Sequence, residues 1–253
     1  MSNDMINTGC VYLLNIFIRY MGQITDVGLY QAASSLTNQY SGLVFTAMLL
    51  DFYPRLASVA GDNEKVKNLV NMQLVVVALM VTPLVCLLIL TSPWVIEVLL
   101  TDKFLSIVPL MRWLGLGILF KALMFPLGYI AFAKDNKKVF FWLEAVFCNL
   151  LTLSLSVFFY LKMGLIGLGI SLSVDCALCI AIYYVVNARL YSYSMSGKVV
   201  REILLAFILA ACCCGFSLDW PEMTPLLSYG AMAFITIVST GYSLVSLRRL
   251  LHR

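Results

Sequence analysis

Charged side chains and histidine are scarce in this sequence. Its 253 residues include 17 Lys and Arg, 13 Asp and Glu and a single histidine, His252, whereas 62% of the residues are hydrophobic. A soluble domain needs far more charge to cover its surface. The scarcity therefore excludes a soluble domain of this length, and lipid must surround most of the chain.

Motifs for catalysis and cofactor binding are also missing. The sequence contains no G-x-S-x-G, no H-E-x-x-H, no P-loop and no pair of carboxylates on one expected helix. We therefore expect no enzymatic activity, no catalytic residue, no cofactor and no metal. The net charge of +4 comes from basic residues dispersed over loop ends, so nucleic acid is not an expected partner.

The eight cysteines do not follow a disulfide pattern, because all of them fall within apolar stretches. Cys176 and Cys179 have C-x-x-C spacing, but no second pair and no histidine lies nearby in the sequence. This favours small apolar filler over a metal or redox site.

Long apolar runs are what the chain does contain. A helix needs roughly 20 apolar residues to cross the bilayer hydrocarbon, and about eight such stretches can be read along the chain. They lie near residues 5–22, 28–50, 69–91, 105–131, 139–161, 165–189, 201–218 and 225–247. We expect an amphipathic piece from Trp94 to Phe104 to lie at one interface. The predicted fold class is an all-α polytopic membrane protein.

Basic residues alternate from loop to loop. They follow the second, fourth, sixth and eighth stretches, whereas the intervening loops are poor in Lys and Arg. The basic positions are Arg55, Lys65, Lys67, Lys134, Lys137, Lys138, Arg189, Lys198, Arg201, Arg248, Arg249 and Arg253. Because basic loops mark the cytoplasmic side of a membrane protein, this alternation predicts that both termini are cytoplasmic.

Five ionisable residues lie inside the expected spans, where a charge at the bilayer centre costs roughly 2.5–3.5 kcal/mol. Arg112 and Lys121 are nine positions apart, so they face opposite sides of a straight helix. Arg112 either binds substrate or extends to the outer interface. Lys121 is expected to neutralise Glu144 or Asp175, or to take part in ion coupling with them. Asp175 is the main candidate for a coupling-ion carboxylate, with a structural ion pair as the alternative. The fifth residue is Arg19.

A polar stripe follows each of the first two helices. At 100° per residue, each set of side chains shares one helix face. The first set is Thr8, Tyr12, Asn15, Arg19 and Gln23, and the second is Gln31, Ser35, Asn38, Gly42 and Thr46. The stripes indicate either a common water-filled cavity or hydrogen bonds between helices. We favour the cavity, because the polar residues are numerous and include an arginine, whose planar group binds two phosphate oxygens at once.

Proline and glycine mark breaks within the helices. Pro83 and Pro126 interrupt the third and fourth stretches, which suits either a transporter that bends or ordinary structural kinks. The sixth stretch begins near Gly164, and its Gly167, Ser171 and Asp175 form a stripe of small residues suited to close helix contact.

Several segments resemble one known family. DVGLYQAASSLTNQYSGLVFTAMLLDFYPRLAS starts at Asp26, and LLTDKFLSIVPLMRWLGLG starts at Leu99. LGYIAFAKDNKK from Leu127 and YLKMGLIGLGIS from Tyr160 follow in order. These segments resemble the second half of polysaccharide flippases, in the O-antigen translocase branch of the multidrug/oligosaccharidyl-lipid/polysaccharide exporter superfamily.

The resemblance implies a fold of two six-helix lobes around a cavity that opens alternately to each side. Residues 1–190 would match the second lobe and residues 191–253 two additional helices. The implied function is flipping of undecaprenyl-pyrophosphate-linked oligosaccharide, such as an O-antigen repeat unit of lipopolysaccharide, across the bacterial inner membrane. Besides that substrate and membrane lipid, the implied partner is a missing first lobe or a second copy of the chain.

The resemblance also assigns roles. Arg19 would attract the pyrophosphate, and the stripe from Gln31 to Thr46 would contact sugar. Arg19, Asn15, Gln31, Ser35, Asn38 and Arg112 are thus the expected substrate-binding residues, and Asp175, Glu144 and Lys121 the ion-coupling candidates. A membrane scaffold subunit of a glycan-assembly complex is the alternative function, although a scaffold does not need a cavity arginine. A glycosyltransferase or polymerase would need a longer periplasmic loop with an Arg or His cluster.

Overall fold

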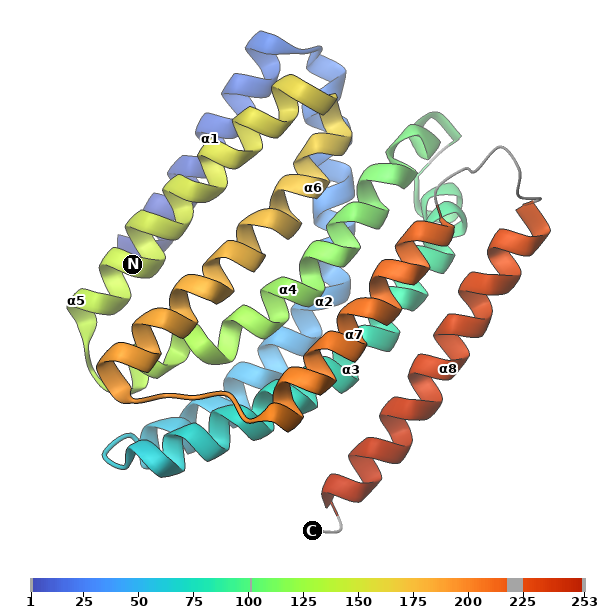
Figure 1. The fold of residues 1–253 in the computed structure, drawn as a ribbon. Coiled ribbons are helices and arrows are strands. Elements are labelled where there is room, and N and C mark those ends of the chain that lie inside the picture. Colours follow the sequence, from blue (N-terminus) through green and yellow to red (C-terminus); the bar gives the residue numbers. More distant parts are fainter. Residues whose placement is uncertain (1, 101, 218–224, 252–253) are drawn as a thin grey trace.

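The computed structural model describes residues 2–100, 102–217 and 225–251, and throughout these ranges it consists of helices joined by short connections (Figure 1). The helices are α1 (Ser2–Met21), α2 (Ile24–Ser58), α3 (Asn63–Leu99), α4 (Val108–Ala133), α5 (Lys137–Phe140), α6 (Asn149–Tyr191), α7 (Gly197–Phe216) and α8 (Pro225–Leu251). Between them lie a 3-10 helix, η1 (Asp102–Ile107), and a π-helix, η2 (Phe141–Cys148). The predicted all-α polytopic fold class is confirmed.

Among the residues that the structure describes, five helical segments are long and apolar enough to cross a membrane by length and composition. They are Asn63–Leu99, Phe104–Ala133, Lys137–Tyr191, Gly197–Phe216 and Leu226–Arg249. α1 and α2 do not meet the same measure, because polar side chains recur along both helices. The two helices that carry the polar stripes are therefore the least lipid-like of the long helices.

The segment from Lys137 to Tyr191 makes two passes across the bundle. Gly164 lies between them with φ 61° and ψ −143°, a conformation that side chains with a Cβ rarely adopt. Figure 1 shows the chain reversing direction between α5 and the part of α6 that carries its label. The two expected stretches near 139–161 and 165–189 are thus separate antiparallel passes with almost no loop between them.

The prediction of a separate amphipathic element from Trp94 to Phe104 is wrong. Residues up to Leu99 continue α3 straight through Pro93, and Phe104 belongs to η1. A proline leaves the carbonyl four residues earlier without its helical donor. Here the Ser92 hydroxyl donates to that carbonyl, Ile89 O, at 2.9 Å, so the helix continues.

The connections lie at two opposite ends of the bundle. In Figure 1 the α2–α3, α4–α5 and α6–α7 connections lie at the lower end, as does the end of α8. The α1–α2 turn, the α3–α4 connection and the reversal at Gly164 lie at the upper end. The basic loops predicted from the sequence therefore gather at one end. At that end Asp62 caps α3, and hydrogen bonds from the backbone N–H of Lys65 and Glu64 lower the pKa of Asp62.

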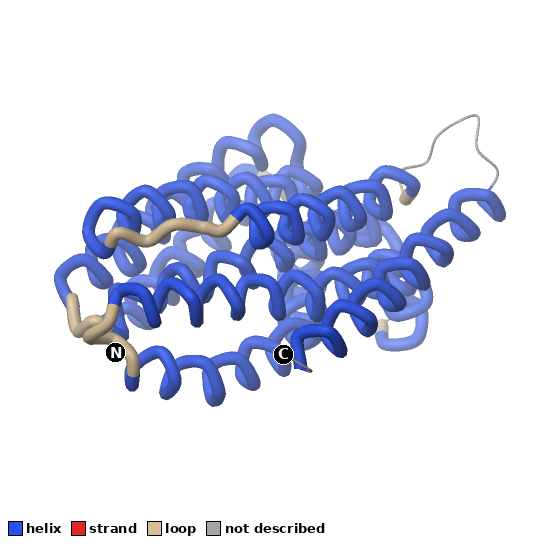
Figure 2. Tube along the Cα trace, turned by 60° about the horizontal axis from the view of Figure 1, so that its bottom comes forward, coloured by secondary structure: helices blue, strands red, loops and turns tan. Residues whose placement is uncertain are grey.

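α3 and α4 form the middle of the bundle. α4 packs against α6, where Gly117 lies against Leu172 and Gly169 against Trp113. α7 and α8 pack against α3 on one flank, and α1 packs against η2 and α6 on the other (Figure 1). Figure 2 shows the same bundle of helices with its lower end turned forward. Apolar side chains of α7 share one core with those of α3 and α4. The domain boundary at residues 190/191 stays a prediction.

Candidate functional site

The polar stripe of α1 lies on its exposed side. Thr8, Tyr12, Arg19 and Gln23 are exposed, and Arg19 has no hydrogen-bond or ion-pair partner within the described part of the chain. Asn15 is half-buried, and its Oδ1 atom is buried without a hydrogen-bond partner. The guanidinium of Arg19 is therefore free to bind an anion from outside this chain.

The stripe of α2 is exposed as well. Gln31, Ser35 and Asn38 are all exposed, and so is Thr46, whose hydroxyl donates to the Gly42 carbonyl at 2.8 Å. The opposite side of the helix is buried through Ala33, Thr37 and Ser41. The stripe of α2 thus faces away from the bundle core, and no hydrogen bond joins its described side chains to another helix.

Hydrogen bonds within the bundle hold Arg112 in place. Its side chain is buried, with Nη1 donating to the Ser217 carbonyl at 2.5 Å and Nε donating to Ser92 Oγ at 3.4 Å. Ser217 is the C-cap of α7, where a cation also neutralises the negative end of the helix dipole. Arg112 thus joins α3, α4 and α7 near the end of the bundle opposite the basic connections, and its expected role in substrate binding stays a prediction.

Lys121 and Glu144 line one pocket, between α2, α4, α5 and η2. The pocket has a volume of about 270 Å³, and aromatic rings form much of its wall. Lys121 Nζ lies 5.9 Å from the centre of the Phe45 ring, within the range of a cation–π interaction. Glu144 is one of the two partners expected for Lys121, and the two residues line the same pocket. Among the described residues they do not form a direct ion pair.

The aromatic lining of this pocket was not predicted from the sequence. Phe45, Phe125, Tyr129 and Phe140 line it, and the Phe125 and Tyr129 ring centres lie 4.3 Å apart. Phe125 and Tyr129 are four residues apart on one helix, a spacing that could have indicated an aromatic face. Phe45 and Phe140 come from other elements, so no sequence spacing relates them.

Asp175 is buried deep in α6. Thr152 Oγ1 donates to its Oδ2 at 2.7 Å, and Cys179 Sγ lies 3.9 Å from its Oδ1. Within the described ranges, Asp175 forms no ion pair. The structural ion pair offered as an alternative role is therefore not formed, and an uncompensated buried carboxylate is a group that binds a proton or cation readily.

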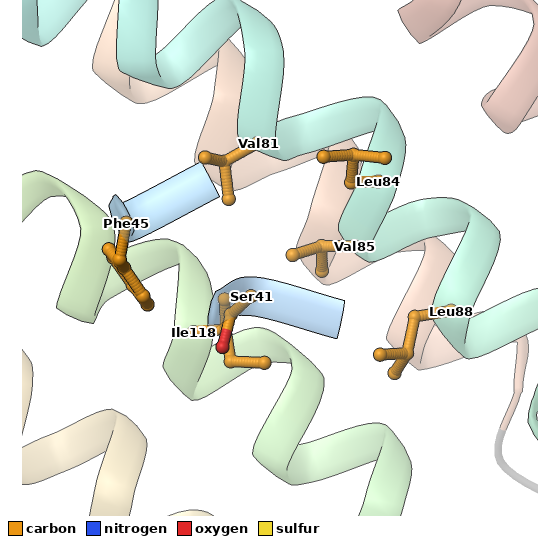
Figure 3. Close-up of a pocket in the computed structure, with 7 residues that line it drawn as sticks. All are labelled: Ser41, Phe45, Val81, Leu84, Val85, Leu88 and Ile118. Atoms are coloured by element: carbon orange, nitrogen blue, oxygen red, sulfur yellow. The ribbon is translucent and has the colours of Figure 1, made fainter. Parts of the chain in front are cut away.

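Figure 3 shows a smaller pocket between α2, α3 and α4, whose lining includes Phe45, Val85 and Ile118. Its volume is about 20 Å³, little more than one water molecule needs. Its one polar side chain, Ser41, already donates to backbone carbonyls of α2. This pocket is a packing gap between helices and has no room for a ligand.

The cysteines are free thiols inside helices, and Cys148, Cys176 and Cys179 are buried around Asp175. In the residues that the structure describes, no group of three or more His, Cys, Asp or Glu side chains is arranged to hold a metal ion.

The helices define an all-α protein of the polytopic membrane class. Residues 1–109 match the family described as polysaccharide biosynthesis protein. The solved structure of the lipid II flippase MurJ, in its inward closed conformation, shares the fold with a TM-score of 0.70 at 16% sequence identity. The match covers 99% of this chain and 53% of that one, so the chain spans about half the length of MurJ. No curated protein gives a sequence match. The resemblance to lipid-linked polysaccharide flippases is confirmed by the family match and the shared fold.

Proposed function

We propose that this chain is one half of a flippase that moves undecaprenyl-pyrophosphate-linked oligosaccharide, an O-antigen or related repeat unit, across the bacterial inner membrane. The observation that carries the proposal is the exposure of two polar stripes on α1 and α2, the helices least suited to lipid. In a chain with the fold of about half of MurJ, such faces suit the wall of a cavity that another lobe completes. That lobe is a first half made separately or a second copy of the chain.

The roles follow from the side-chain chemistry. Arg19 binds the pyrophosphate, since its fork can hold two phosphate oxygens. Asn15, Gln31, Ser35 and Asn38 offer amide and hydroxyl groups to sugar hydroxyls. The lipid tail remains in the bilayer, and rocking of the two lobes changes access to the cavity without covalent chemistry.

Ion coupling is assigned to the buried and half-buried charges. Asp175 takes up and releases the coupling cation, because it is a buried carboxylate without an ion-pair partner among the described residues. Lys121 and Glu144, which line one pocket, take part in the same coupling step. We propose that the basic end of the bundle faces the cytoplasm, with both termini on that side of the membrane.

The experiment that tests the proposal is complementation of a flippase-null strain with the whole transporter carrying Arg19→Ala. Hydrogen bonds to charged groups are worth about 1.5–3 kcal/mol, so we expect surface glycan to fall roughly ten- to hundredfold. Arg189→Ala is the matched control, because Arg189 is also exposed but lies at the end of α6. Equal surface glycan from both variants would count against the proposal and favour a scaffold subunit.

A further inference from the structure

A second charged pocket lies on the opposite flank of the bundle from α1. α3, α7 and α8 enclose it, with Lys198 and Arg201 at the start of α7 and Arg249 in the last turn of α8. Its volume is about 370 Å³, within the range of small-molecule sites. Val75 and Leu79 of α3 supply an apolar wall. Charged rims above an apolar wall suit a ligand that is itself amphipathic.

The pocket retains an excess of positive charge. Its one carboxylate, Glu202, is buried and is bonded to Arg201 at 2.9 Å and to the Tyr242 hydroxyl at 2.7 Å. Lys198 and Arg249 are exposed, and within the described ranges neither has an ion-pair or hydrogen-bond partner. Lys198 and Arg249 are thus available to an anionic ligand, whereas the carboxylate of Glu202 is already paired with Arg201 and Tyr242.

Hydrogen bonds hold the surroundings of the pocket in place. The connection before α7 is tied to α3, since Tyr193 Oη donates to Asn71 Oδ1 at 2.9 Å and Asn71 Nδ2 donates to the Ser194 carbonyl at 3.1 Å. Ser196 then caps the first turn of α7. The positions of Lys198 and Arg201 are therefore fixed relative to α3 before any ligand binds.

The pocket is shallow. Further along α7, beyond Glu202 and Tyr242, the adjoining hollow has a volume of only about 10 Å³. A headgroup can enter the wide part, but an oligosaccharide or a long acyl chain cannot continue between the helices at that depth.

We propose that this pocket binds the phosphate of an anionic phospholipid headgroup. Its basic residues come from the start of α7 and the last turn of α8, and both of these helix ends lie where the basic connections gather, the level at which headgroups sit (Figure 1). Basic pockets between transmembrane helices bind anionic headgroups, and each nearby Lys or Arg contributes about 1 kcal/mol. The site is separate from the polar stripes, so the proposal does not rest on the flippase assignment.

The test measures lipid binding to the purified full chain by native mass spectrometry. The probes are phosphatidylglycerol, zwitterionic phosphatidylcholine and inorganic phosphate. The variants are Lys198→Gln, Arg249→Gln and their combination. The matched control is Arg248→Gln, which removes the neighbouring exposed charge without touching the pocket lining. Arg201 is left intact because Glu202 depends on it.

We expect phosphatidylglycerol to bind the wild-type chain more tightly than phosphatidylcholine does. Each pocket variant should weaken it roughly fivefold, and the double variant about 25-fold, if the charges act independently. Arg248→Gln should bind like the wild type. The proposal is overturned if Arg248→Gln weakens binding as much as the pocket variants, or if phosphatidylcholine binds equally well. If an equal concentration of inorganic phosphate displaced phosphatidylglycerol, the proposal that the ligand is a lipid would be wrong. Thermal unfolding of each variant shows whether a loss of binding reflects a loss of fold.

Discussion

At the scale of single residues, Asp175 stands out because its hydrogen-bonding neighbours are neutral groups. A hydroxyl from Thr152 and the thiol of Cys179 are its polar neighbours, and the described residues place no cation in contact with it. A carboxylate in such a place is costly unless it binds a proton or a metal cation. A purely structural role would be served as well by an amide.

Replacing Asp175 with Asn therefore separates the two roles. Asn keeps the shape and an acceptor for the Thr152 hydroxyl but cannot change charge. We expect transport by the whole protein to fall roughly tenfold or more, with little change in the thermal unfolding midpoint. Glycan transport and thermal unfolding in detergent are the two measurements.

The control for Asp175 is Ser171→Ala one turn earlier. Ser171 Oγ lies 3.2 Å from Ser156 Oγ, so this change removes a buried hydrogen bond and no charge. Transport should survive in this control. Normal transport by Asp175→Asn would remove Asp175 from the coupling mechanism.

At the scale of helices, the reversal at Gly164 joins two long passes without a loop. Its φ of 61° and ψ of −143° lie where a Cβ causes strain, although the space around the residue is open. Three residues later, Gly167 lies against the backbone of Phe159, so the two passes also approach closely. The conformation of one residue thus sets how the fifth and sixth passes meet.

Gly164→Ala should destabilise the protein by about 1–3 kcal/mol, the usual cost of such backbone strain. For a chain of this size, about 1 kcal/mol lowers the unfolding midpoint by roughly 2–4 °C. Intrinsic fluorescence during heating in detergent measures the shift. Gly230→Ala is the control, because Gly230 lies inside α8 with open space around its Cα and an ordinary helical backbone. Matching midpoints for the two variants would mean that the strain at Gly164 is absent.

At the scale of the whole molecule, two kinds of exposed surface occur on one bundle. α8 exposes apolar side chains such as Phe234 and Ile237, which are 68% and 71% exposed. α2 exposes the amide and hydroxyl groups of Gln31, Ser35 and Asn38. Lipid suits the first surface, and water or a polar ligand suits the second.

Cysteine substitution distinguishes these surfaces in a chain whose eight native cysteines have been replaced. A membrane-impermeant maleimide reacts with a thiolate, which forms in water and not among acyl chains. We expect Asn38→Cys to react readily and Ile237→Cys to remain unlabelled, although both positions are exposed in the structure. Labelling is read by a mass shift on gels. If Asn38→Cys did not react in any transport state, the result would contradict both the water-filled cavity and the proposed flippase function.

Much of this architecture can be predicted from the sequence. Apolar runs, basic connections and the glycines near residue 164 predict the passes and their reversal, because lipid and backbone geometry act locally. Contacts between helices are different, since lipid-facing and core-facing positions are equally apolar. Arg112 and the Ser217 carbonyl, 105 residues apart, could not be paired from spacing. The same holds for the pocket that joins Lys198 to Arg249.

The π-helix η2 contributes Glu144 to the wall of the Lys121 pocket and has wider turns than α6, which follows it. Asn149 Nδ2 donates to both the Glu144 and the Ala145 carbonyls, at 3.2 and 2.9 Å, where the wide winding gives way to the tighter α6. Rewinding these wide turns into ordinary α-helix would lengthen the segment and rotate it about its axis. Glu144 and Phe140 would then change position relative to the aromatic rings on the opposite wall of the pocket, although the connecting turns keep their conformation.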